Sequence, residues 1–347
     1  MSNAPLPLTP AQPIAPHGLP RFGSFQGEAS RVNLDALAGT WKRSGLQRAL
    51  RRKRWNYSLV ATPEVLVAFV ITDLGYVANA FVTAVNLKSG VVLCDESFMG
   101  LPGVHGRVGD APGAGLDASF RARGAGFSVL RGVQEDAFQL AVSLPARRSG
   151  LTLRASLQSR GAAPALSVLA PVDDARVNFT QKVNALPARG SLTVGGKTYS
   201  LDGGVGGMDY TQGDLARHTA WRWAFAAGHL ADGRAVGFNL VEGFNEGHLD
   251  ANENALWVGE ALFPLGRARF TYEEHDLGGA WGVRTEDGAL DVSFRSLAVH
   301  REDLNIGLIV SHYVQPLGLF HGEVRVNGET LQLESIPGVT ERQDMRW

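Results

Sequence analysis

The sequence has a single cysteine, Cys94, among its 347 residues. One cysteine can form neither an intramolecular disulfide nor a cysteine-based zinc site, so we expect no cross-link and no metal. The 33 Lys and Arg residues balance the 34 Asp and Glu residues, which argues against nucleic acid as a partner. Gly-x-Ser-x-Gly, Walker and His-Glu-x-x-His motifs do not occur, so the sequence predicts no organic cofactor.

Long apolar runs are also missing. The best run, residues 65–71, is far shorter than the roughly 20 residues of a membrane helix. The N-terminal residues have neither the basic stretch nor the apolar segment of a signal peptide, and their prolines oppose a helix. We therefore predict a cytoplasmic protein without a transmembrane segment, in which residues 1–20 form a flexible, proline-rich arm.

What is abundant is glycine, with 42 residues, and much of it lies at turns. Asp232-Gly233, Asp287-Gly288 and Asn327-Gly328 are dipeptides typical of tight β-hairpins. Apolar and polar residues alternate over residues 290–295, as in a half-buried strand. These patterns predict a mostly β protein built from antiparallel strands.

One strand pattern occurs twice. Residues 54–57 (Arg-Trp-Asn-Tyr) precede the apolar run 67–73, and residues 222–225 (Arg-Trp-Ala-Phe) precede the similar run 236–242. Both runs follow Val-small-Phe-x-aliphatic-x-acid. The repeat predicts an internal duplication that gives two similar, lipocalin-like antiparallel β-barrels related by a pseudo-two-fold axis.

Linker-like sequences between residues 160 and 180 divide the chain into an N-terminal barrel domain, residues 21–170, and a C-terminal barrel domain, residues 171–347. Apolar residues at helical spacing between Asn33 and Arg52 predict one N-terminal helix. Basic residues follow at its C-terminal end, where the helix dipole favours cations that face water. Contact of these residues with a membrane surface or an anionic ligand is the alternative.

Seven segments resemble a bacterial family of uncharacterised proteins, catalogued as domain of unknown function 2804. They are residues 178–187 (Asn-Phe-Thr-Gln-Lys-Val-Asn-Ala-Leu-Pro), 208–213 (Met-Asp-Tyr-Thr-Gln-Gly), 221–223 (Trp-Arg-Trp), 237–240 (Gly-Phe-Asn-Leu), 253–257 (Glu-Asn-Ala-Leu-Trp), 311–315 (Ser-His-Tyr-Val-Gln) and 338–341 (Gly-Val-Thr-Glu). The resemblance spans residues 21–347. Family members carry Asp-Trp-x-Arg-Gly where this chain has Asp-Tyr-Thr-Gln-Gly, so an arginine is missing here.

This family is similar in architecture to two-barrel lipocalin-like proteins, among them carotenoid hydratases and tocopherol cyclases. Those proteins act on isoprenoid or lipid substrates without a metal or organic cofactor. The resemblance therefore implies a hydrophobic small-molecule ligand for this chain, by analogy of fold.

Acidic residues end the two apolar runs of the repeat at equivalent positions, Asp73 and Glu242. Loss of hydration favours the neutral form of a carboxyl group, which could protonate an alkene or hold a polar head group. The alternative is a structural ion pair with Arg54 or Arg222 at the end of each strand. Our candidate catalytic residues are Glu242, Asp209 and Asp73.

Aromatic and polar residues are densest in the second half of the chain. Trp221 and Trp223 share one strand face, so they could stack on a flat ligand or a cation. His312 could move a proton at neutral pH. The candidate ligand-binding residues are Trp221, Trp223, Asn239, Glu253, Asn254, His312 and Tyr57. The alternative is that these are core tryptophans, turn-forming polar residues and a buried structural histidine.

The leading hypothesis is a two-barrel protein that binds a lipid or isoprenoid in an apolar interior. A hydratase, cyclase or isomerase that acts on such a molecule through a buried carboxylic acid, without a cofactor, is the alternative. A structural protein whose barrels are filled by side chains is a third. A cavity with convergent polar groups would favour the enzyme, and a smooth apolar cavity would favour the binding protein. Oligomeric state and peripheral membrane contact stay open.

Overall fold

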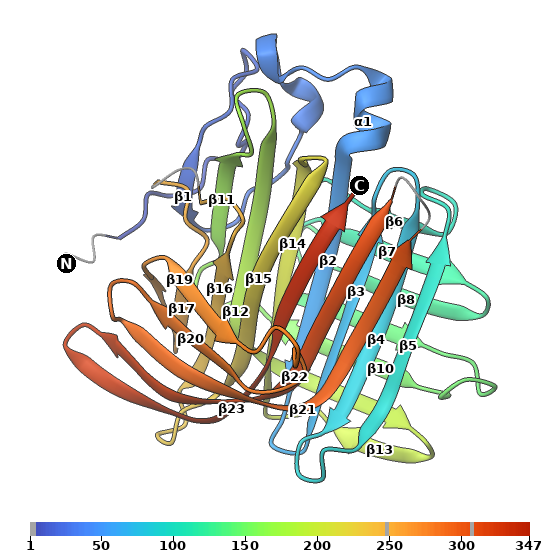
Figure 1. The fold of residues 1–347 in the computed structure, drawn as a ribbon, viewed down its shortest axis with the longest axis vertical. Coiled ribbons are helices and arrows are strands. Elements are labelled where there is room, and N and C mark those ends of the chain that lie inside the picture. Colours follow the sequence, from blue (N-terminus) through green and yellow to red (C-terminus); the bar gives the residue numbers. More distant parts are fainter. Residues whose placement is uncertain (1–4, 247–249, 306–308) are drawn as a thin grey trace.

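The computed structural model describes residues 5–246, 250–305 and 309–347. It is mostly β, with one sheet of 14 strands and one of nine strands. The first sheet forms a nearly closed barrel and the second a half-barrel. In Figure 1 the orange and red strands of the second sheet lie over the blue and cyan strands of the first. The predicted fold class is confirmed.

The first sheet contains the strands β1 to β14. They are β1 (Gly23–Gln26), β2 (Arg52–Ala61), β3 (Val65–Asp73), β4 (Ala78–Asn86), β5 (Val92–Gly100), β6 (Gly106–Val108), β7 (Asp117–Ala122), β8 (Ala125–Leu130), β9 (Ala137–Ser143), β10 (Thr152–Gln158), β11 (Leu166–Pro171), β12 (Val177–Val194), β13 (Lys197–Ser200) and β14 (Gly204–Asp214). The main path runs β5-β4-β3-β2-β14-β12-β10-β9-β8-β7-β6.

The second sheet contains the strands β15 to β23. They are β15 (His218–His229), β16 (Ala235–Glu242), β17 (Ala255–Val258), β18 (Ala261–Pro264), β19 (Ala268–Tyr272), β20 (Trp281–Thr285), β21 (Leu290–Asn305), β22 (Val310–Val326) and β23 (Glu329–Arg346). Their order is β18-β17-β16-β15-β23-β22-β21-β20-β19. Both sheets thus begin with a four-strand meander, and its first strand, β2 or β15, pairs with the last strand of its unit, β14 or β23.

The strand register matches in the two copies of the repeat. Arg54 on β2 lies opposite Asp73 on β3, and Arg222 on β15 lies opposite Glu242 on β16. The acids of the two copies are therefore equivalent in structure as well as in sequence.

The chain passes from the first sheet to the second at a later residue than the sequence indicated. The change comes between β14 and β15, at residues 214–218, whereas we had placed the boundary at residues 160–180. The linker-like residues before β11 and after it are turns within the first sheet, because β12 pairs with β10, β11 and β14. Polar, proline-containing turns look the same in sequence whether they join strands or domains.

The predicted N-terminal helix is present but is shorter than residues 33–52. The segment forms two 3₁₀ turns, Leu34–Ala36 and Gly39–Trp41, and one short α-helix, α1 (Gly45–Arg51). Gly39 has a φ of 59° and interrupts the helical path, and Ser44 caps α1. In the described part of the chain, no helix has the length and apolar character that crossing a bilayer demands.

Two of the basic residues that we expected in water are buried. Arg52 forms an ion pair with Asp214, with Nε and Oδ1 2.7 Å apart. The Lys53 Nζ donates to the carbonyl oxygens of Leu50 and Leu74 at 2.7 and 2.8 Å. The reason is that β2 begins at Arg52. The two side chains point to opposite faces of this strand, and both faces are covered.

The N-terminal arm is also packed rather than free over its described residues, 5–20. The Thr9 backbone N–H donates to the Gln26 carbonyl at 2.9 Å, and Ile14 and Ala15 are buried. The prolines prevent a helix here, but the segment is held in an extended conformation by pairing with a strand, which does not require a helix.

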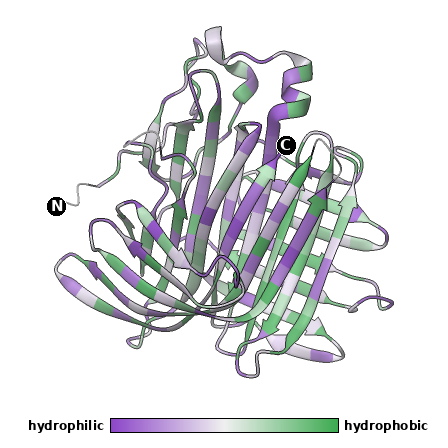
Figure 2. Ribbon diagram, in the orientation of Figure 1, coloured by the Kyte–Doolittle hydropathy of each residue, from purple (hydrophilic) through white to green (hydrophobic). Residues whose placement is uncertain are grey.

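Buried apolar side chains form three large clusters. One, which includes Phe69 and Phe127, fills the first barrel, and another, which includes Phe238, lies within the half-barrel. The third takes residues from both sheets, among them Tyr57 and Trp223. Figure 2 shows the corresponding alternation of hydrophobic and hydrophilic bands along the strands. Both faces of the central strands are thus buried, and we call the layer between the two sheets the seam.

A buried amide joins the sheets at the seam. The Nδ2 of Asn184 on β12 donates to the carbonyl oxygens of Ala226 and Phe238, at 3.1 and 3.2 Å. Gly237 allows this approach, because a Cβ atom there would lie 2.3 Å from Asn184 Oδ1. This contact explains the glycine in the segment 237–240.

Candidate functional site

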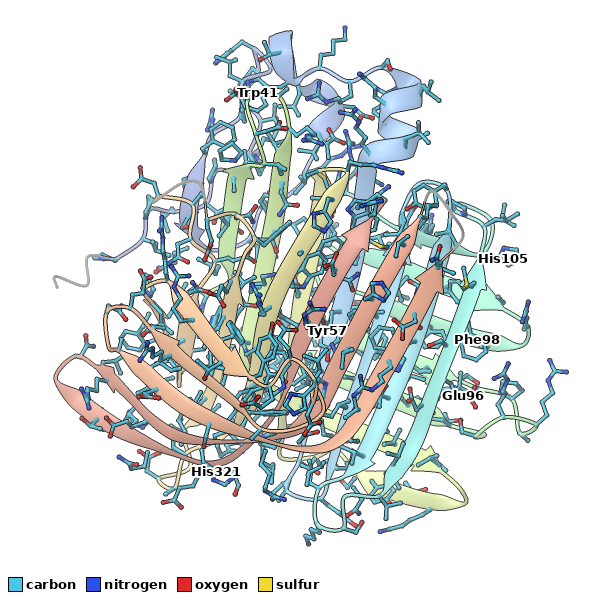
Figure 3. The ribbon with its side chains drawn as sticks, in the orientation of Figure 1. Trp41, Tyr57, Glu96, Phe98, His105 and His321 are labelled. Carbon is cyan, nitrogen blue, oxygen red and sulfur yellow. The ribbon has the colours of Figure 1, made fainter. Side chains whose placement is uncertain are left out.

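A cavity of about 130 Å³ lies in the seam, between the central strands of the two sheets. Tyr57, labelled in Figure 3, marks its position in the middle of the molecule. The lining residues are Trp55, Tyr57, Val70, Thr72, Leu74, Asn79, Phe81, Asp209, Trp221, Trp223, Glu302, Ser311, Tyr313, Glu341, Gln343, Met345 and Trp347. Several of them, including Trp55 and Trp221, are only partly buried, so the cavity reaches the surface. We had expected a ligand inside a barrel, whereas this cavity lies between the two.

The alternation of side chains along a strand decides which residues reach the seam. Trp55 and Tyr57 on β2 face it, and so do Trp221 and Trp223 on β15. The rings of Trp55 and Trp221 stack across the seam with centroids 6.0 Å apart, and Tyr57 meets Trp223 edge to face at 5.0 Å. The two tryptophans predicted on one strand face are therefore at the cavity, together with the aromatic residues of the first copy.

Glu341 on β23 is one of the carboxyl groups that line the cavity, and it is 5% exposed. Its oxygens accept hydrogen bonds from the Trp221 Nε1, the Tyr313 hydroxyl and the Gln315 Nε2, each at 2.8 Å. Among the described residues no cation forms an ion pair with it. Burial raises the pKa of Glu341 to about 6, although the three hydrogen bonds oppose the shift.

Tyr57 connects to Glu341 through a glutamine. The Tyr57 hydroxyl donates to the Gln315 Oε1 at 3.3 Å, and the Gln315 Nε2 donates to both Glu341 and the Tyr313 hydroxyl. Burial raises the pKa of Tyr57 and of Tyr313 well above the usual range, so both phenols stay protonated. Glu341 therefore lies within a network of neutral donors.

Asp209 on β14 reaches the same cavity but has a charged neighbour. The Lys182 Nζ lies 2.6 Å from Asp209 Oδ1 and 3.1 Å from Glu253 Oε2, and all three side chains are buried. Burial alone would lower the pKa of Lys182, but the two carboxylates outweigh it and raise the pKa. Burial raises the pKa of Glu253, against the effect of Lys182. The Trp55 Nε1 donates to Asp209 Oδ2 at 3.4 Å.

Three predicted ligand-binding residues do not line the cavity but contact the residues around it. Asn239 accepts a hydrogen bond from the Trp223 Nε1 at 2.8 Å and donates to the Glu253 carbonyl at 2.7 Å. Asn254 Oδ1 accepts from the Val241 backbone N–H at 2.6 Å. Asn239, Asn254 and Glu253 thus hold lining residues or their neighbours in place.

Asp73, Glu242 and His312 lie outside the cavity. Asp73 accepts from the Gly75 backbone N–H at 3.0 Å, and Glu242 lies 3.4 Å from the Arg269 Nη1. The side chains beside them in sequence, at positions 72 and 241, face the seam, so alternation turns both acids to the other face. His312 is exposed and bonds to Asp303, because its neighbour Tyr313 faces the seam.

The residues that we missed include Glu341, Tyr313, Gln315, Trp55 and Glu302. The first three lie in the segments 338–341 and 311–315, which were quoted as motifs, so the signal was present in the sequence. Nothing in the pattern of the strands indicated that Glu341 and Glu302 come together, because β23 and β21 do not pair with each other.

A buried histidine joins the two sheets beside the cavity. His300 on β21 is buried, with its Nδ1 2.6 Å from Asp95 Oδ1 on β5 and its Nε2 3.7 Å from Glu302 Oε1. Its ring lies 4.2 Å from that of Phe81, which lines the cavity. Burial would lower the pKa of His300, but the two carboxylates outweigh it and raise the pKa to about 9.

Within the described ranges no group of three or more His, Cys, Asp and Glu side chains is arranged to hold a metal ion.

The family model described as domain of unknown function (DUF2804) matches residues 9–347. The chain belongs to this family. No curated protein matches the DUF2804 chain.

Solved structures share the fold of this DUF2804 protein. Kievitone hydratase from Nectria haematococca is 14% identical, with a TM-score of 0.52 over 95% of this chain and 97% of that one. The structure of CghA with Sch210972 is 15% identical, with a TM-score of 0.52 over 98% of this chain and 97% of that one. At such identities the likeness concerns the fold alone.

Proposed function

We propose that the seam cavity binds a small, largely apolar molecule and that Glu341 transfers a proton to or from it, in a hydration or isomerisation. The observation that carries the proposal is a buried carboxyl group, without a cationic partner among the described residues, in a cavity whose lining includes seven aromatic side chains. A cavity with convergent polar groups favours an enzyme over a passive binding protein.

The protonation of Glu341 suits this role. Because its pKa is about 6, both its acid and its base forms are populated near neutral pH. Tyr57 and Tyr313 line the cavity and are fixed by hydrogen bonds, so their neutral hydroxyl oxygens can accept a hydrogen bond from a polar group of the substrate.

For a hydration, the protonated Glu341 gives its proton to one carbon of a carbon–carbon double bond. Water adds to the other carbon and loses a proton to the Glu341 carboxylate, so the net change is the addition of water. For an isomerisation, the carboxylate removes a proton from one carbon and returns it to another. One protein with this fold bears the name of a hydratase, which supports the reaction class.

The test begins with the molecule that accompanies the protein. Native mass spectrometry and organic extraction of the purified chain identify a bound small molecule, which is then returned to the ligand-free protein in D₂O. We expect deuterium to enter a carbon position of that molecule, as measured by NMR. The variant Glu341→Gln should slow this exchange by about 10²–10⁴-fold, the contribution typical of general acid–base catalysis.

The exposed Glu260→Gln variant is the matched control, and it should exchange at the wild-type rate. If the wild type binds the molecule but no carbon exchanges, the chain is a binding protein and the catalytic role is wrong. Equal exchange by Glu341→Gln and wild type would assign the reaction to another residue.

A further inference from the structure

The charged side chains that line the cavity are all acidic among the described residues. Its lining includes three carboxyl side chains, Asp209, Glu302 and Glu341, and no Lys, Arg or His from the described residues. Seven of its lining residues are aromatic, and the face of an aromatic ring carries the negative end of its quadrupole.

The hydrogen-bond donors around the cavity are already used by the protein. The Nε1 groups of Trp221, Trp223 and Trp55 donate to Glu341, Asn239 and Asp209, respectively. The Tyr313 hydroxyl donates to Glu341 as well. An anionic group would therefore find no free indole or phenol donor here, whereas a cation needs no such donor.

The charges next to the cavity do not cancel. The cations are Lys182, His300 and Lys53, whose Nζ lies 5.1 Å from the centre of the Trp347 ring and donates to the Leu74 carbonyl. The carboxyl groups around them and in the cavity are Asp95, Asp209, Glu253, Glu302 and Glu341. Burial raises the pKa of Glu253 and of Glu341, and repulsion from Asp209 adds to both shifts.

We propose that the end of the ligand that enters the seam cavity is a cation, a substituted ammonium group. It would lie against the stacked pair of Trp55 and Trp221, with Glu341 as its counter-ion. This inference rests on the proposed function, since it uses the same cavity and the Glu341 carboxylate, which is the form that acts as the base in an isomerisation. It adds the chemical class of the ligand: an apolar small molecule that carries an amine.

The size of the cavity agrees with a head group rather than a whole lipid. Its volume is about 130 Å³. A dry cavity of about 150 Å³ accommodates benzene, so a compact ammonium group fits and a long chain does not. The rest of the ligand would lie in the opening, beside partly exposed residues such as Thr72 and Leu74.

Three probes of one shape and different charge test the proposal. They are choline, the uncharged 3,3-dimethylbutan-1-ol and the anionic 3,3-dimethylbutanoate. Binding to the full chain is measured by calorimetry and by tryptophan fluorescence, because tryptophans line the cavity. We expect choline to bind more tightly than the alcohol by about tenfold or more, and the anion not to bind.

Two variants assign the selectivity to the cavity. Glu341→Gln should weaken choline binding by about tenfold and leave binding of the alcohol unchanged, because it removes a charge and little volume. Trp55→Leu should weaken choline more than the alcohol, because it removes an aromatic face. The exposed Glu260→Gln is the control that should change neither, and thermal unfolding verifies that each variant is folded.

Equal or tighter binding of the alcohol, preference for the anion, or no binding of choline would overturn the cationic head group. These results leave the proton transfer at Glu341 intact if Glu341→Gln still slows deuterium exchange. Conversely, selective binding of choline with normal exchange by Glu341→Gln would support the cationic head group and contradict the proposed function.

Discussion

Asp209 and Glu341 lie on equivalent strands of the duplicated units, but the charges of the side chains next to them differ. Asp209 lies on β14 opposite Tyr57, and Glu341 lies on β23 opposite Trp223. Both are buried and both line the cavity. Asp209 is 2.6 Å from the ammonium group of Lys182, whereas Glu341 has neutral donors only.

The strands next to these carboxyl groups explain the difference. Lys182 on β12 lies directly opposite Asp209, but the equivalent strand β22 supplies Tyr313 and Gln315. Similar burial therefore gives a fixed ion pair in one unit and a titrating acid in the other. The comparison teaches that two buried acids on equivalent strands differ in charge environment because the neighbouring strand supplies a lysine in one unit and neutral donors in the other.

Removing the lysine should have the largest effect on this comparison. Lys182→Met leaves Asp209 and Glu253 buried without their cation, so we expect a loss of about 3–5 kcal/mol in the free energy of unfolding, measured with urea. The control is Lys197→Met, which breaks the exposed pair with Glu64 and should change little. A loss as small as that of the control would show that the buried ion pair is dispensable.

The second effect concerns pH. Because the pKa of His300 is raised from 6.5 to about 9, its protonation stabilises the fold fully below pH 6.5, and this stabilisation is lost as the pH rises through about 9. The free energy of unfolding should fall by up to about 3 kcal/mol over that range. His300→Gln should remove this part of the slope, and the exposed His312→Gln should keep it. Parallel slopes in all three proteins would contradict the role of His300.

A smaller effect is expected for Glu341→Gln. Since the pKa of Glu341 is raised from 4.5 to about 6, its proton stabilises the folded state at low pH, and the stabilisation is lost as the pH rises through 6. On acidification from pH 7 to 5, the wild type should gain about 1–2 kcal/mol more than the variant. Urea unfolding at pH 7 and pH 5 measures this gain in the free energy of unfolding. An identical gain in the two proteins would mean that Glu341 does not titrate between these pH values.

The smallest effects should come from the acids that the repeat singles out. Glu242→Gln and Asp73→Asn alter partly exposed groups outside the cavity, so each should cost less than about 1 kcal/mol. Deuterium exchange into the ligand should stay at the wild-type rate in both. A slow Glu242→Gln variant would instead support the catalytic role predicted for Glu242 from the sequence.

The sequence was sufficient for the fold class because hairpin turns, alternation and the repeat are local patterns. It also identified Tyr57, Trp221, Trp223 and Asp209, which do line the cavity. The alternation that places Trp221 and Trp223 in the seam also turns Glu242 away from it. Arg222 lies between the two tryptophans and pairs with Glu242, so the orientation of Glu242 could have been predicted from the sequence.

Glu341 could not be ranked above other acids by pattern alone. Its neighbours Tyr313 and Trp221 come from strands on either side of β23, and the effect of burial depends on the facing sheet. The boundary was misplaced for a similar reason, since only the pairing of β14 with β2 shows that residues 204–214 belong to the first unit.

The apolar cluster in the seam has a consequence for folding cooperativity. It draws side chains from both sheets, so neither half of the duplication could leave the other without exposing it to water. The two units should therefore unfold in one calorimetric transition, and a fragment that ends at residue 214 should not be stable alone. An ancestral single unit must have had a partner, such as a second copy of itself, to cover that face, and the duplication made the partnership covalent.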